Sequence, residues 1–67
     1  MVQMTIAAAR VNAGYKQGAA ARLIGVSQQT LRNWEKGKTI PNQMHIEAMC
    51  KLYGVTYDVL FFANKIS

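Results

Sequence analysis

The sequence of 67 residues has one cysteine, one histidine and three acidic residues. A single cysteine, Cys50, excludes an intrachain disulfide framework and fits a reducing compartment. One histidine and no CxxC pair leave too few donors for a conventional metal site, so we expect no metal and no cofactor. Catalysis needs a nucleophile beside a base, or two opposed carboxylates, and the three acids are not clustered. We therefore predict that the protein is not an enzyme.

Long apolar runs are absent as well. The longest is Val59–Ala63, whereas a membrane-spanning helix needs about 20 apolar residues. The N-terminus has no apolar h-region, so we expect no signal peptide. The length and an apolar fraction of 51% predict one folded domain over residues 1–67.

Acidic residues are scarcest where the basic residues gather. The formal net charge is +5, and all of this excess lies in residues 1–38, where Glu35 is the only acid. A surface that is basic by chance is one explanation. A footprint for the phosphates of a nucleic acid is favoured, because the basic part coincides with the helical motif described next. A membrane-surface helix is disfavoured, because the basic and apolar residues do not share one helix.

Helix starts and stops predict an all-α fold of five short helices, with no strand. The expected helices span residues 6–12 (capped by Thr5), 17–24, 28–36, a fourth segment that Pro41 opens and Gly54 ends, and 57–61 (capped by Thr56). Only Gly25 and Val26 separate the second helix from Ser27, the cap of the third. So short a connection predicts a helix-turn-helix at helices 2 and 3.

The third helix has two different sides. Leu31 and Trp34 share one side and are expected in the core. The other side is rich in amides and nearly free of acids, and it holds Gln28, Gln29, Arg32, Asn33 and Lys36. Amide and guanidinium groups pair bidentately with base edges, and lysine neutralises phosphate, so this side indicates a surface that reads double-stranded DNA.

These residues carry a resemblance to a known family. The pattern Gln17-x3-Ala21, Gly25-Val26-Ser27-Gln28-Gln29 and Trp34-Glu35-Lys36-Gly37, followed by Pro41, resembles the Cro/phage-repressor (XRE-type) helix-turn-helix family over Ile6 to Phe61. It is similar to lambdoid phage repressor DNA-binding domains. The resemblance implies a lambda-repressor-like fold and a transcriptional regulator, expected to be a repressor that binds a two-fold operator as a homodimer. It further implies a cytoplasmic, nucleoid-associated protein of bacterial or phage origin.

The resemblance also implies individual roles. Gln17 would bond a phosphate and brace Gln28, while Arg10 would form a structural ion pair with Glu35. A local pair of Glu35 with Arg32 or Lys38 is the alternative. The expected DNA-binding residues are Gln17, Gln28, Gln29, Arg32, Asn33, Lys36, Lys38, Thr39 and Asn42, with backbone amides around Lys38, Thr39, Ile40 and Asn42 holding the sugar-phosphate backbone. Gly18 departs from the family, in which an acidic residue is common at this position.

The C-terminal apolar run has a different expected use. A short last helix cannot bury all of its apolar residues, and exposed aromatics usually mark an interface. The family commonly dimerises through this helix, which implies a dimer interface at Val59, Phe61 and Phe62. A plug on the core is one alternative. Another is a protein partner at this helix, which would make the chain an interaction module of antitoxin or bridging type with secondary DNA binding.

Overall fold

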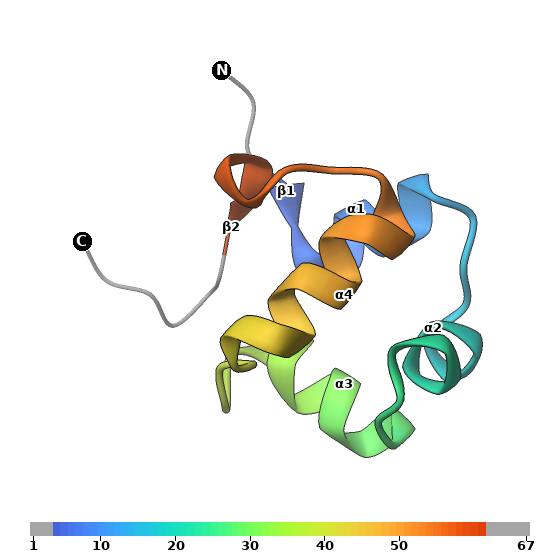
Figure 1. Ribbon diagram of the computed structural model, residues 1–67. Coiled ribbons are helices and arrows are strands. Elements are labelled where there is room, and N and C mark those ends of the chain that lie inside the picture. Colours follow the sequence, from blue (N-terminus) through green and yellow to red (C-terminus); the bar gives the residue numbers. More distant parts are fainter. Residues whose placement is uncertain (1–3, 62–67) are drawn as a thin grey trace.

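The computed structural model describes residues 4–61, with side chains described through residue 58. Over these residues there are four α-helices, α1 (Ile6–Asn12), α2 (Gln17–Ile24), α3 (Gln28–Lys36) and α4 (Gln43–Tyr53), and a 3₁₀ helix, η1 (Tyr57–Val59). Two short strands are β1 (Met4–Thr5) and β2 (Leu60–Phe61). Figure 1 shows α2 and α3 on the side of the molecule opposite the strands, with α4 passing between. The predicted all-α class with a helix-turn-helix at α2 and α3 is confirmed.

The first three helices span the predicted residues, and three of their ends are fixed by caps. The hydroxyl of Thr5 accepts from the amide of Ala8 at 3.0 Å, and that of Ser27 accepts from the amide of Thr30 at 3.1 Å. Helix α2 ends at Gly25, which has a left-handed φ of 98°. A side chain is strained there, so glycine lets the chain leave α2 and enter α3 within a few residues.

The predicted start of the fourth helix is wrong by two residues. Pro41 does not open α4; it is buried and precedes Asn42, which is the N-cap. The side-chain oxygen of Asn42 accepts from the amide of His45 at 2.9 Å. Asparagine satisfies an otherwise unpaired amide of the first turn, which proline cannot do, and this sets the helix start.

The predicted fifth helix and the predicted absence of strands are also wrong. The chain forms the single 3₁₀ turn η1 and then extends into β2, which pairs in parallel with β1. The register places Met4 opposite Leu60 and Thr5 opposite Phe61. The backbone groups of these residues are satisfied by a partner far away in the sequence, in place of a helical turn. Of the expected dimer residues, Phe62 lies outside the described residues, and Val59 and Phe61 are described by their backbone.

No helix in residues 4–61 is long and apolar enough to cross a membrane.

All four α-helices contribute to one core. Alanines on α2 allow its backbone to approach the neighbouring helices closely, while larger side chains fill the centre. The buried apolar residues are Ile6, Ala9, Ala20, Ala21, Leu31, Trp34, Ile46, Met49 and Tyr53.

Candidate nucleic-acid interface

Helix α3 presents one polar side to solvent. Its apolar side is fixed by Leu31 and Trp34, which are 0% and 6% exposed. The Trp34 ring packs against the ring of His45 on α4, with centroids 5.1 Å apart. On the other side, Asn33 is partly buried and the remaining side chains are exposed. We call this side the α3 outer face; it consists of Gln28, Gln29, Arg32, Asn33 and Lys36.

The start of α3 favours an anionic partner. Ser27 caps the helix, and its hydroxyl also lies 2.9 Å from the hydroxyl of Thr30. The first turn contains no acidic residue, so the positive end of the helix dipole is not neutralised by a side chain of that turn. Gln28 and Gln29 stand at this end and are both exposed. The residues best suited to read bases therefore lie where the helix attracts phosphate.

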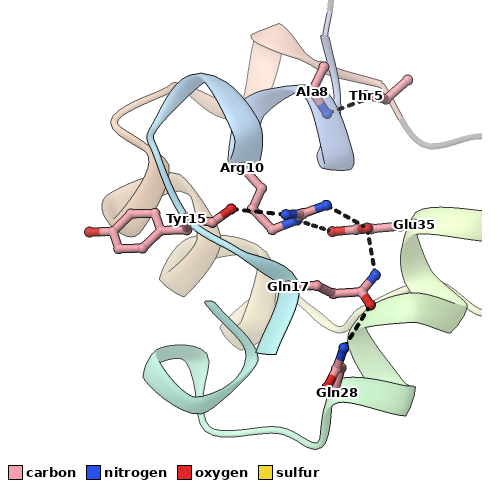
Figure 2. Close-up of polar contacts among 7 residues, drawn as sticks. All are labelled: Thr5, Ala8, Arg10, Tyr15, Gln17, Gln28 and Glu35. Atoms are coloured by element: carbon pink, nitrogen blue, oxygen red, sulfur yellow. Dashed lines mark hydrogen bonds and ion pairs between the residues drawn. The ribbon is translucent and has the colours of Figure 1, made fainter. Parts of the chain in front are cut away.

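A chain of hydrogen bonds joins the α3 outer face to α2 (Figure 2). Gln28 Nε2 donates to Gln17 Oε1 at 3.2 Å, and Gln17 Nε2 donates to Glu35 Oε1 at 2.9 Å. A carboxylate only accepts, so the Gln17 amide must turn its nitrogen toward Glu35 and its oxygen toward Gln28. Gln28 must then use its nitrogen. Its Oε1 and second N–H stay available, and adenine takes these two groups bidentately.

The same carboxylate ties α3 to α1. Arg10 Nε donates to Glu35 Oε2 at 2.8 Å, and Arg10 Nη2 approaches Glu35 Oε1 at 3.4 Å. Arg10 Nη1 donates to the carbonyl oxygen of Tyr15 at 2.9 Å, in the connection between α1 and α2. The Arg10 and Glu35 side chains are 14% and 8% exposed. The expected ion pair is therefore present, and the alternative partners of Glu35, Arg32 and Lys38, do not form it.

Tyr53 on α4 lies next to this polar cluster. Its ring is tilted against that of Tyr15, with centroids 6.3 Å apart, and its hydroxyl is buried with no hydrogen-bond partner among the described residues. Burial raises the pKa of Tyr53 to about 12; the Glu35 charge adds to the rise and Arg10 opposes it. No signal in the sequence placed Tyr53 here, because the approach depends on how α4 packs.

A second amide pair lies on the α3 outer face. Gln29 Nε2 donates to Asn33 Oδ1 at 3.0 Å, across one helical turn. The bond leaves Gln29 Oε1 and the Asn33 amide nitrogen to face outward. Arg32 and Lys36 are exposed beside them, and Glu35, the one acid of α3, is directed away into the cluster with Arg10. The α3 outer face thus combines amides and positive charge without a carboxylate.

The connection after α3 holds the remaining expected residues. The amide of Lys38 donates to the carbonyl oxygen of Asn33 at 2.9 Å, so this amide already has a partner within the fold. The Lys38 side chain and Thr39 are exposed. Among the described residues, the amides of Thr39 and Ile40 have no hydrogen-bond partner. Asn42 uses its side chain to cap α4.

The fold and this surface define a helix-turn-helix DNA-binding domain. A protein-family model described as Helix-turn-helix matches residues 6–60, and the chain belongs to this family, of XRE type and Cro/C1-like. The class is that of a DNA-binding transcription regulator. In the other two comparisons, no curated protein and no solved structure matches the chain.

Proposed function

We propose that this protein is a sequence-specific repressor that reads a two-fold operator as a homodimer. The observation that carries the proposal is the α3 outer face: exposed, free of carboxylates, and led by a glutamine whose amide is held in one orientation. Gln28, Gln29, Arg32 and Asn33 read base edges in the major groove. Lys36, Lys38 and the amides of Thr39 and Ile40 hold phosphates, and Gln17 joins them at the start of α2. The protein works in the cytoplasm of a bacterium, on the nucleoid, from a bacterial or phage gene.

Repression is proposed because it makes the fewest demands on a DNA-binding domain. A regulator that covers a promoter needs only occupancy, whereas an activator needs a second surface for polymerase. A symmetric dimer places two copies of α3 about 34 Å apart, one turn of B-DNA. The operator is therefore expected to have dyad symmetry.

Selection from random duplexes tests the proposal. The protein should enrich a consensus with two inverted half-sites, and its affinity should fall steeply between about 50 and 200 mM salt. A salt-dependent affinity without any consensus would leave only non-specific binding and would contradict the proposal. Absence of a consensus together with a protein that binds the C-terminal segment would support the interaction-module alternative.

Single substitutions at the reading residues should remove specificity at one position. Gln28→Ala and Gln29→Ala are each expected to cost about 1–3 kcal/mol at one base pair, because one bidentate pair is lost, and to leave non-specific binding nearly unchanged. Fluorescence anisotropy on operators that carry each of the four bases at that position measures this. Lys38→Ala is the matched control: it should weaken all duplexes alike and lower the salt slope by about one. A uniform loss for the glutamine variants would contradict their assignment as base readers.

The proposed dimer has its own test. The apolar run 59–63 and the family resemblance support an interface that includes Val59, Phe61 and Phe62. Phe61→Ser should shift the sedimentation profile toward monomer, because a polar group replaces an aromatic anchor of the interface. Far-UV circular dichroism provides the control that the variant still folds. A wild-type protein that sediments as a monomer at all concentrations, alone and on its operator, would exclude the homodimer.

A further inference from the structure

Gly18 is the one glycine among residues 4–61 whose backbone does not require glycine. The four others, Gly14, Gly25, Gly37 and Gly54, all have positive φ angles. Gly18 is the second residue of α2, where alanine is favoured over glycine by helix propensity. A residue that breaks a local rule without a conformational reason points to a contact that needs the space.

The space beside Gly18 is taken by the side chain of Gln28. A Cβ built on Gly18 would lie 3.3 Å from Gln28 Oε1 and 3.7 Å from Gln28 Cδ. Oxygen and carbon at 3.3 Å are closer than in ordinary contacts, so the Gln28 amide would have to move. The Gln28 side chain is exposed, so its amide can shift at little cost to the stability of the fold. It does change where the amide sits.

Two contacts hold the Gln28 amide, and the same displacement alters both. The oxygen rests over Gly18, and the nitrogen donates to Gln17 Oε1 at 3.2 Å, near the long end of hydrogen-bond lengths. A shift of the oxygen by a few tenths of an ångström moves the amide nitrogen as well, and its bond to Gln17 is already long enough for this to weaken it. A freed glutamine must be ordered again when it binds a base, and this ordering weakens discrimination.

We propose that Gly18 is a specificity-determining residue: the absence of a side chain at this position lets Gln28 fold back over α2 and present its amide in one orientation to the base it reads. The inference rests on the proposed function, since it assigns a role to Gln28 in DNA. It also makes a statement about the free protein, namely that Gln28 is held before any DNA is bound.

Gly18→Ala separates an effect of Gly18 on the stability of the helix from an effect on discrimination between bases. The variant should fold with an unfolding midpoint that is unchanged or up to about 5 °C higher, because alanine favours the helix. Its discrimination should fall by about 5-fold or more at the base pair affected by Gln28→Ala, and at no other. In a Gln28→Ala background, Gly18→Ala should change discrimination no further. Ala19→Gly, at an exposed neighbouring position of the same helix, is the matched control and should lower the midpoint without changing discrimination.

Side-chain amide NMR of the free protein tests the positioning without DNA. The Gln28 NH₂ resonances should be ordered in wild type and mobile in Gly18→Ala. Unchanged order, or unchanged discrimination in a protein whose Gln28→Ala variant does lose it, overturns the role of Gly18 and leaves the proposed function standing. A loss that is equal on all sequences overturns it as well. If wild type enriches no consensus at all, the proposed function fails, and with it the role of Gly18 in specificity.

Discussion

Arg10→Met is expected to lower the free energy of unfolding by about 3 kcal/mol. The Arg10 and Glu35 side chains are only 14% and 8% exposed, so removing the guanidinium leaves a carboxylate with little access to water. The carbonyl of Tyr15 also loses its donor. A domain of 67 residues has about 3–10 kcal/mol of total stability, so the variant should lie close to unfolding. Urea denaturation followed by circular dichroism measures the loss.

A double-mutant cycle separates the charge from the packing. Methionine replaces the apolar stem of arginine without the guanidinium group, so the loss in Arg10→Met reports chiefly on the missing charge and donors. Adding Glu35→Gln should recover about 1–2 kcal/mol, because an unpaired neutral amide costs less to bury than an unpaired carboxylate. A loss below about 1 kcal/mol in Arg10→Met would mean that the pair behaves as a surface salt bridge and does not anchor α3 to α1.

The sequence predicted α1, α2 and α3 to the residue because their boundaries depend on local chemistry. Thr5 and Ser27 supply cap oxygens, and Gly25 supplies the left-handed φ that ends α2. The start of α4 was predicted less well, since Pro41 and Asn42 are adjacent and both are signals of a helix start. The strands were missed because each has two residues and pairs with a segment more than fifty residues away. Neither shows the alternation that reveals a strand.

The residues of the α3 outer face could be predicted from the sequence, but the orientations of their side chains could not. Helical periodicity separates Leu31 and Trp34 from the α3 outer face, so the set of exposed residues follows from spacing alone. The amide orientation of Gln28 cannot be predicted from spacing, because it depends on the hydrogen bond between Gln17 and Glu35, which joins two helices. The contact of Gly18 with Gln28 likewise depends on the close approach of α2 and α3. From the sequence, Gly18 was noted only as a departure from the family.

Tyr53 should make the protein unusually sensitive to alkali. Burial raises its pKa from 10.0 to about 12, so the folded protein holds the phenol proton more tightly than the unfolded chain. Stability that depends on the neutral phenol is fully present below pH 10 and is lost as the pH rises to about 12. The difference of about two units corresponds to at most about 2–3 kcal/mol, because solvent screening reduces it, and this is still a substantial part of the stability of a domain of this size. Urea denaturation from pH 8 to pH 11.5 follows the decline.

Tyr53→Phe identifies the phenol as the source of that decline. At pH 8 the variant should be as stable as wild type or up to about 1 kcal/mol more stable, because a buried hydroxyl without a partner among the described residues is removed. Its stability should then decline less between pH 10 and pH 11.5. Tyr15→Phe is the matched control. It removes the hydroxyl of the ring that faces Tyr53 but keeps the buried Tyr53 hydroxyl, so stability should decline as in wild type. Parallel curves for wild type and Tyr53→Phe would show that other groups cause the alkaline loss. Divergence confined to this pH range would identify the Tyr53 phenol as the group that causes the alkaline loss of stability.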